Sequence, residues 1–295
     1  MDEVTKNMLR SEQLFYEAAR HATEFRPKRI RSLAVPFPKR YRYRWEEKDG
    51  KRRPLSIPSR ALRMVQDFLQ REILQFLDIH DAAHGYRKAR STVSALTPHI
   101  NPEILVCLDA QAFFSSITEE AVKQRLLEHG ALERLATLIA ALCTDKGMLP
   151  QGTPTSPSLS NTVGFPLDNA CASTAKEYGY IYTRFVDDLV FTCKENRDRD
   201  DVDRFLDDVC NHIRGLGYGI QTKKFKVAKG FQNQEVLGLV LNKSGDGLPL
   251  RVTRKFKRRL RAALHQIETR GEAEWNETQV QSARAYIEMV EGKDG

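Results

Sequence analysis

Three aspartates in this sequence stand in the context of a phosphoryl-transfer site. Asp187 and Asp188 interrupt the apolar stretch Ile181–Phe191, whose β-branched and aromatic residues indicate a hairpin with the two acids at its turn. Asp109 ends a second apolar stretch, Ile104–Leu108, where a carboxylate is costly to bury unless it is paired or binds a metal. A strand-end aspartate and a pair at a hairpin tip could hold two Mg²⁺ ions roughly 3.5–4 Å apart. One ion would activate an attacking hydroxyl and the other would stabilise the leaving phosphate.

Two adjacent aspartates also occur at turns for a purely structural reason, because an aspartate side chain caps a turn by hydrogen-bonding its own backbone. The segment between the acids favours the catalytic alternative, since residues 149–157 read Leu-Pro-Gln-Gly-Thr-Pro-Thr-Ser-Pro. The order of Asp109, this segment and Phe185-Val186-Asp187-Asp188 resembles the palm of reverse transcriptases. The resemblance extends from about residue 48 to residue 265 and implies an α+β, right-handed polymerase fold with fingers, palm and a helical thumb. It also identifies the three aspartates as catalytic ligands of two Mg²⁺ ions.

The resemblance implies that three parts of the chain bind the incoming nucleotide. Arg53 would meet the triphosphate, since a guanidinium matches phosphate geometry in a bidentate manner; otherwise it belongs to a solvated basic hairpin. Phe114 would lie beneath the sugar and exclude a ribose 2′-hydroxyl, unless both it and Phe113 are core residues. Gln151 and Gly152 would contact the nucleotide or the template, although the two flanking prolines suit a structural loop equally well.

The same resemblance assigns a proton donor and the surfaces for the nucleic acid strands. Lys224 aligns with the lysine that protonates the departing pyrophosphate, although a lysine-rich strand end can be merely solvated. The resemblance places Arg87 and Arg90 near the template, and Leu237 and Gly238 in the strands that hold the primer. In the basic C-terminal helix, salt-dependent phosphate contacts are expected from four residues, Arg254, Lys255, Arg258 and Arg259.

The charge of the chain favours a polyanionic partner. The 47 lysines and arginines exceed the 39 aspartates and glutamates, which gives a net charge of +8. Twelve basic residues and three acids lie between Arg26 and Arg53, and seven of the eleven residues from Arg251 to Arg261 are basic. Two basic ends around a neutral-to-acidic middle indicate a groove that grips nucleic acid from both sides.

Cysteine usage and hydropathy indicate the location of the protein. The five cysteines are widely spaced and form no Cys-x-x-Cys or Cys/His cluster, so neither structural zinc nor a disulfide framework is expected. No apolar run approaches the roughly 18 residues of a membrane span, and the N-terminus has no signal pattern. We therefore expect a cytoplasmic protein with no membrane contact.

The elements that would position these residues follow from periodicity and from turn residues. We expect an N-terminal helix over 1–25, short strands and loops rather than helix over 26–59, and a hairpin turn at 48–51. Further helices are expected over 61–79, over 157–178, over 203–216 and through the last fifty residues, and further strands over 219–227 and 235–242. A short helix is expected to begin at Ser91, and a longer one, capped by Thr118, is expected to continue to about residue 142. The predicted domains are fingers 26–105, interleaved with the palm, then palm 106–242 and thumb 243–295. Asp168 falls in a helix, where a structural role is favoured over metal binding.

Within the family, the chain looks most like the compact bacterial enzymes of retrons and group II introns. The 55 residues after Val240 are too few for an RNase H domain and contain no Cys/His endonuclease cluster, which favours the retron type. Two sequence motifs typical of retron enzymes are altered in this chain. The motif Asn-Ala-x-x-His corresponds to residues 95–99, where only His99 is kept, and the motif Val-Thr-Gly appears as Val236-Leu237-Gly238. A retron-type enzyme would copy a cognate structured non-coding RNA with dNTPs, from a 2′-hydroxyl of that RNA, into branched RNA–DNA (msDNA). The resemblance also implies an antiviral, antiphage complex with an effector protein.

Three alternatives stay open. Another bacterial reverse transcriptase, CRISPR-associated or of another defence type, would keep the chemistry and change the RNA. An RNA-templated RNA polymerase would share the palm, but such enzymes typically carry Gly-Asp-Asp and lack an aromatic residue at the position of Phe114. A non-catalytic RNA-binding scaffold would keep the basic thumb and lose the acids, whereas all three acids are present in this chain.

Overall fold

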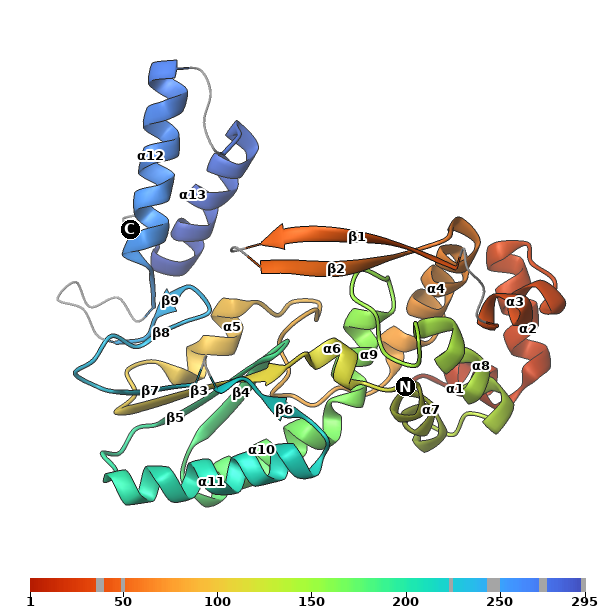
Figure 1. Cartoon of the computed structure of the whole chain (residues 1–295), viewed down its shortest axis with the longest axis horizontal. Coiled ribbons are helices and arrows are strands. Elements are labelled where there is room, and N and C mark those ends of the chain that lie inside the picture. The colour runs from red at the N-terminus through yellow and green to blue at the C-terminus, as the bar shows by residue number, and fades with distance from the viewer. Residues whose placement is uncertain (36–39, 49–50, 223–224, 243–249, 271–274, 293–295) are drawn as a thin grey trace.

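The computed structural model describes residues 1–35, 40–48, 51–222, 225–242, 250–270 and 275–292, and they form the α+β fold expected from the sequence. An antiparallel sheet of five strands lies at the centre of the molecule (Figure 1). Its strands are β4 (Ile181–Phe185), β5 (Asp188–Cys193), β3 (Ile104–Gln111), β6 (Gly219–Ile220) and β7 (Lys226–Lys229). The strand expected over 219–227 is thus two short strands. Both pair with β3, whose other edge pairs with β5, so the strand that carries Asp109 is central.

Side-chain alternation divides this sheet into two faces. Val106 and Leu108 belong to the main hydrophobic core, whereas Leu105 and Val190 belong to a smaller core on the other face. The first face is covered by α10 (Phe165–Glu177) and α11 (Arg199–Gly215), which lie beneath the sheet in Figure 1. The second face is therefore the one available for the acids and their substrates.

The helix expected over 157–178 is divided by Gly164 into α9 (Ser156–Val163) and α10. A Cβ at Gly164 would lie 2.8 Å from the Ser160 carbonyl oxygen and 3.0 Å from Nη2 of Arg184, so a close approach of chain segments requires glycine here. The helix expected from residue 203 begins earlier, at Arg199, because the side chain of Asp198 accepts a hydrogen bond from the Asp201 amide and caps it.

The N-terminal region corrects two expectations. The single helix expected over 1–25 is two helices, α1 (Glu3–Arg10) and α2 (Glu12–Thr23), because Ser11 is extended and its hydroxyl caps the second helix. The stretch over 26–59 was expected to lack helix, but it contains α3 (Pro27–Ala34). Pro27 occupies the first turn of this helix, where a missing amide hydrogen removes no hydrogen bond. Ile30 and Leu33 of α3 are fully buried, and this burial stabilises the helix.

The expected hairpin is present as β1 (Tyr41–Lys48) and β2 (Lys51–Pro58), with Lys48 opposite Lys51. The helix expected over 61–79 is α4 (Arg60–Glu72), followed by the 3₁₀ turn η1 (Leu74–Phe76). The shorter elements that follow are α5 (Thr92–Leu96), capped by Ser91 as expected, then η2 (Thr97–His99) and α6 (Phe113–Ser116).

The helix expected from Thr118 to about Leu142 is also two helices, α7 (Glu119–Glu128) and α8 (Glu133–Cys143). Thr118 caps the first as expected, and the chain turns at Gly130, where φ is +84°. Although residues 119–143 fall in the range predicted as palm, α8 packs against α3 and α4 of the N-terminal region.

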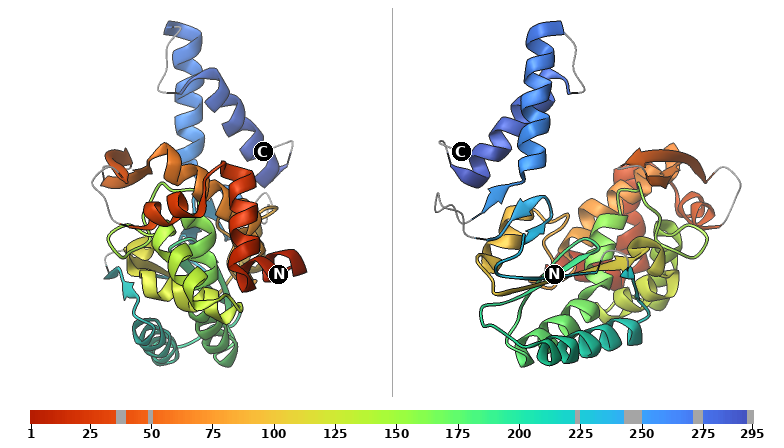
Figure 2. Two further views of the ribbon diagram at one scale, coloured as in Figure 1. Left: turned by 90° about the vertical axis from the view of Figure 1, so that its right-hand side faces the viewer. Right: turned by 60° about the vertical axis from the view of Figure 1, so that its left-hand side comes forward.

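A second, three-stranded sheet connects the palm to the C-terminal helices. It comprises β8 (Glu235–Val236), β9 (Leu239–Val240) and β10 (Arg251–Val252). The single strand expected over 235–242 is therefore a hairpin, because Leu237 and Gly238 adopt positive φ and form a two-residue turn. α12 (Arg254–Arg270) and α13 (Glu277–Glu291) pack against each other and stand apart from the N-terminal helices in Figure 1 and in the right panel of Figure 2. Across the described ranges, no helix is long and apolar enough to span a membrane.

Candidate active site

Asp109 and Asp188 are brought together by the register of the palm sheet. They are directly opposite partners on β3 and β5. Alternation along each strand puts both side chains on the face that bears Leu105 and Val190, away from α10 and α11. Directly opposite residues of an antiparallel pair have Cβ atoms about 4.5–5.5 Å apart. Asp109 is 6% exposed and Asp188 is half-buried, so the two carboxylates lie at the border between the sheet and solvent.

The third acid, Asp187, occupies the turn of the hairpin. Because Phe185 pairs with Asp188, the turn consists of Val186 and Asp187. Val186 has φ +62°, which is strained for a β-branched residue. The Asp187 carbonyl accepts a hydrogen bond of 2.8 Å from the Ala110 amide, which fastens the turn to β3 next to Asp109. The hairpin predicted from the sequence is thus observed, with its acids at the tip and beside Asp109.

The donor chemistry of these acids fits Mg²⁺, which prefers carboxylate oxygens. Within the described part of the chain, no three His, Cys, Asp or Glu side chains are close enough together to make a metal site by themselves. That arrangement still suits Mg²⁺, because proteins usually hold this ion with one or two carboxylates and complete its shell with water and substrate phosphates. Asp109 and Asp188 would supply the opposed carboxylates, and Asp187 the third.

The side of the site predicted to hold a nucleotide sugar is lined by aromatic rings. Ala112, at φ +52°, turns the chain from β3 into α6, so that Phe113 enters the core and Phe114 is only half-buried. The ring of Phe114 contacts that of Tyr86 edge-on, with centroids 6.3 Å apart. Burial raises the pKa of Tyr86, the Asp187 carboxylate raises it further, and Arg53 opposes the shift. Tyr86 therefore lies within electrostatic reach of both Asp187, predicted to be a catalytic acid, and Arg53, predicted to bind triphosphate.

Tyr86 was not identified from the sequence. It is exposed, has φ +56°, and follows Gly85, where a Cβ would lie only 2.7 Å from Val186 Cγ2. The sequence offered no distinctive signal for it, because single exposed aromatic residues in loops are common.

The fingers strand β2 is joined to the loop that carries Gln151 and Gly152. The Ser56 amide donates a hydrogen bond of 2.8 Å to the Gln151 carbonyl. Gly152 has φ +95°, and a Cβ there would lie 3.4 Å from the Ser56 carbonyl oxygen and 3.5 Å from the Leu55 side chain. Arg53 is exposed and shares a strand face with Leu55. The structure therefore brings the Arg53 strand and the Gln151–Gly152 loop together at one edge of the site.

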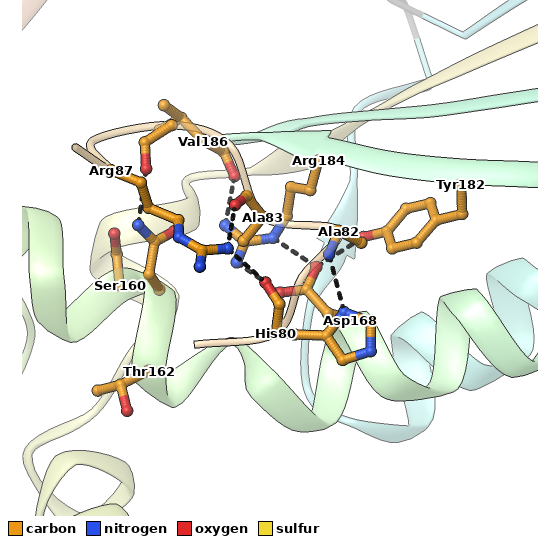
Figure 3. Close-up of polar contacts among 12 residues, drawn as sticks. His80, Ala82, Ala83, Arg87, Ser160, Thr162, Asp168, Tyr182, Arg184 and Val186 are labelled. Carbon is orange, nitrogen blue, oxygen red and sulfur yellow. Dashed lines mark hydrogen bonds and ion pairs between the residues drawn. The ribbon is translucent and has the colours of Figure 1, made fainter. Parts of the chain in front are cut away.

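Arg87 and Arg90, predicted to reach the template, stabilise the loop that contains them. Nη1 of Arg87 donates to the carbonyls of His80 and Ala83, at 3.1 and 3.0 Å (Figure 3). Arg90 lies 3.4 Å from Nε2 of His84, and each arginine has one guanidinium nitrogen 3.9 Å from Asp81. Arg90 keeps the more exposed side chain of the two, so it has the greater freedom to reach a strand.

The surfaces predicted for primer and duplex lie on the second sheet and on α12. Leu237 and Gly238 form the turn between β8 and β9. The side chains of Arg254, Lys255, Arg258 and Arg259 are exposed on α12, and the Arg259 guanidinium lies over the ring of Trp275 at 5.3 Å. Lys257, between them, is instead paired with the buried Glu291 of α13. Lys224 lies outside the described residues.

Comparison with known proteins identifies the family to which this chain belongs. Residues 45–241 match the family model described as "Reverse transcriptase (RNA-dependent DNA polymerase)". The retron Mx162 reverse transcriptase of Myxococcus xanthus is 30% identical over 277 residues, covering 84% of this chain and 57% of that protein. Retron Mx65 reverse transcriptase of the same organism is 28% identical over 293 residues, covering 92% and 64%. Retron Ec86 reverse transcriptase of Escherichia coli is 29% identical over 249 residues, covering 83% and 76%.

The first two of these relatives are longer, so the chain spans less than two thirds of their length. Among solved structures, a telomerase from Candida tropicalis, determined in complex with a telomeric RNA fragment, aligns with a TM-score of 0.50 over 87% of this chain and 53% of that one. At 12% sequence identity, this likeness supports the fold alone.

Proposed function

Because the chain belongs to the reverse transcriptase (RNA-dependent DNA polymerase) family, we propose that it is an RNA-directed DNA polymerase of the retron type. The observation that carries the proposal is the cross-strand pair Asp109 and Asp188, with Asp187 at the adjoining turn. Two opposed carboxylates on the open face of the central sheet, with a third acid in the adjoining turn, have the charge and the donor atoms that nucleotidyl transfer requires.

In the proposed reaction, a primer hydroxyl attacks the α-phosphorus of a dNTP paired with an RNA template. The new O–P bond forms as the bond to the oxygen bridging the β-phosphorus breaks, and pyrophosphate leaves with that electron pair. Two Mg²⁺ ions, held by Asp109, Asp187 and Asp188, would supply hydroxyl activation and charge neutralisation when bound. Lys224 is proposed to protonate the pyrophosphate, by resemblance to the family.

The remaining residues of the site bind and select the nucleotide. Arg53 would hold the triphosphate, and Gln151 and Gly152 would contact the base pair being formed. Phe114 would exclude a 2′-hydroxyl by occupying the space beneath the sugar. The half-buried Phe114 ring contacts the rings of Phe113 and Tyr86, at centroid distances of 6.0 and 6.3 Å. These contacts support the role, because a side chain that excludes a hydroxyl by its volume must be held in place.

The proposed natural template is a cognate structured non-coding RNA, copied from one of its own 2′-hydroxyls into msDNA. The similarity to three retron reverse transcriptases over 83% or more of this chain supports this assignment. A role in antiviral defence with an effector protein is part of the same proposal. So is a cytoplasmic location, with which the five unpaired cysteine thiols agree.

The experiment is to purify the protein from its native host locus and to sequence the co-purifying nucleic acid, with and without RNase. We expect a short DNA covalently joined to one abundant RNA. Heterogeneous RNA without attached DNA would overturn the retron assignment. Two explanations would then remain, another reverse transcriptase or an RNA-binding scaffold. Extension of an oligo(dT) primer on poly(rA) distinguishes them, because only a reverse transcriptase extends the primer.

A further inference from the structure

Arg184 is the largest fully buried side chain of the described residues, and it forms an ion pair with the equally buried Asp168 of α10. Its Nε donates to Oδ1 at 2.7 Å and its Nη2 to Oδ2 at 2.6 Å, while the Tyr182 hydroxyl donates to Oδ1 at 2.8 Å. Burial opposes the charge on Arg184, but the Asp168 carboxylate outweighs it and raises the arginine pKa. Asp168 is thus occupied by these partners, which agrees with the structural role expected for it.

The ion pair alone would hold α10 to the sheet, but Arg184 makes one further contact. Its third nitrogen, Nη1, donates to the Val186 carbonyl at 3.0 Å (Figure 3). Val186 is the strained residue of the hairpin turn, and its carbonyl belongs to the peptide bond that leads directly into Asp187. The guanidinium therefore connects α10 to the turn that carries Asp187 and leads into Asp188.

The turn is confined from several sides. A Cβ on Gly85 would lie 2.7 Å from Val186 Cγ2, so the 85–86 loop presses against the valine side chain. That loop is in turn fixed to β4, because the Arg184 amide donates to Ala82 and the Arg184 carbonyl accepts from His84, at 2.7 and 2.8 Å. The Arg184 guanidinium also lies over the ring of Phe113, 5.2 Å from its centroid.

This geometry points to a specific role, which rests on the proposed function: we infer that Arg184, held by Asp168, is a positioning residue for the catalytic hairpin. A strained backbone conformation persists only where the surroundings over-determine it. The hydrogen bond to the Val186 carbonyl supplies that constraint, and so fixes where the carboxylates of Asp187 and Asp188 point. Arg184 touches neither substrate nor metal in this role. It acts through the backbone of the turn.

The test separates the structural and the positioning roles by removing both charges together. The double variant Arg184→Met, Asp168→Leu replaces the buried pair with apolar side chains of similar volume, an exchange that often leaves stability unchanged or improved. It nevertheless removes the donor to the Val186 carbonyl. A second variant, Arg184→Lys, keeps the buried charge pair. Its shorter side chain and single ammonium do not reproduce the fixed fork in which Nε and Nη2 bind the carboxylate while Nη1 binds that carbonyl. Val209→Ala, a buried truncation on α11, is the matched control for general destabilisation of the palm.

Three quantities are measured for each variant: the melting temperature, kcat and KM for dTTP on poly(rA)·oligo(dT), and Mn²⁺ binding by the loss of the free-ion EPR signal. For the double variant we expect a melting temperature no lower than that of Val209→Ala, although the buried Tyr182 hydroxyl loses its acceptor. We also expect kcat or Mn²⁺ affinity to fall roughly 10- to 100-fold, as for other residues that orient metal ligands. Arg184→Lys should show the same loss, whereas Val209→Ala should lower the melting temperature and leave Mn²⁺ affinity unchanged.

Each outcome bears on one of the two claims. Wild-type kcat and Mn²⁺ affinity in either Arg184 variant would overturn the positioning role while leaving the polymerase assignment in place. If the double variant does not fold, the folded Arg184→Lys decides the question alone. A wild-type protein that binds Mn²⁺ but extends no primer would instead overturn the proposed function, and the positioning inference with it.

Discussion

Asp109 and Asp188 are directly opposite each other on neighbouring antiparallel strands, 79 positions apart in the chain. Two like charges so placed repel each other, and cross-strand pairs of this kind are normally destabilising. A divalent cation between the carboxylates would convert repulsion into attraction, so the site is expected to be less stable empty than filled.

The first prediction concerns the acids themselves. Asp187→Asn removes a negative charge without a change of size, so it should lower primer extension about 10³-fold or more while RNA binding stays intact. Extension of a labelled primer and a filter-binding measurement on the same RNA test the two halves separately. If RNA binding is lost together with synthesis, the acids serve the structure of the palm rather than catalysis.

The second prediction concerns sugar selection. Phe114→Ala should reduce the preference for dNTPs over rNTPs roughly 10- to 100-fold, because the space for a 2′-hydroxyl is opened. The ratio of kcat/KM for dTTP and UTP on poly(rA) measures it. Phe113→Leu is the matched control, since Phe113 is 3% exposed and packs in the core. It should lower the melting temperature and leave that ratio as in the wild type; an altered ratio in Phe113→Leu alone would reverse the assignment.

The third prediction concerns Tyr86. Tyr86→Ala removes the ring that lies edge-on against Phe114, and should raise KM for the nucleotide about three- to tenfold, the usual worth of an aromatic pair. Tyr86→Phe keeps the ring and should retain most of the affinity. Steady-state kinetics with dTTP distinguish the two variants. An equal loss in both would mean that the hydroxyl, near Asp187 and Arg53, is the part that matters.

The fourth prediction concerns the pH dependence of stability. His99 is fully buried, with Nε2 and Nδ1 at 2.8 and 2.6 Å from the hydroxyls of Thr183 and Thr192. Burial lowers its pKa to about 3, and the nearby His84 and Lys194 add to the shift. Because the unfolded pKa is about 6.5, the unfolded chain binds the proton first as pH falls. The stability that the neutral, buried His99 contributes is therefore fully present above pH 6.5 and is lost as the pH falls toward 3.

When the pH is lowered from 7.5 to 5, the titration of His99 should reduce the free energy of unfolding by about 2 kcal/mol. Urea titrations at the two pH values measure the loss. His99→Gln should be less stable at pH 7.5, yet should lose less on acidification than the wild type. Identical pH slopes in the two proteins would show that His99 does not titrate between folded and unfolded states.

The fifth prediction concerns the basic helix α12. Arg258→Ala should weaken binding to RNA–DNA duplexes of any sequence and reduce the slope of log affinity against log salt by about 1. Arg204→Ala is the matched control, because this exposed arginine lies on α11 and pairs with Asp201. Titrations at several salt concentrations compare the variants. If both substitutions change the slope equally, the effect comes from net charge and not from a thumb surface.

The local features of the site could be predicted from the residue pattern alone. The hairpin between β4 and β5, with Asp187 in its turn, and the helix starts at Ser91 and Thr118 were predicted correctly. The strand of Asp109 continues to Gln111, and Asp188 begins β5 instead of lying in the turn. These features depend on side-chain alternation and on hydrogen bonds within three or four residues, which a sequence displays directly. Errors arose where burial outweighed local preference, as in α3, or where one residue divided a continuous pattern, as at Ser11 and Gly164.

Which distant residues come into contact follows from the packing of the whole chain. The register that puts Asp109 opposite Asp188, the approach of Tyr86 to Phe114, and the three-way contact of Arg184 with Asp168 and Val186 join segments from different parts of the chain. No local pattern encodes such contacts, because they result from how sheet and helices pack their apolar faces together. The sequence does not show whether an arginine is buried or exposed, so the role of Arg184 follows only from the partners that surround it in the packed core.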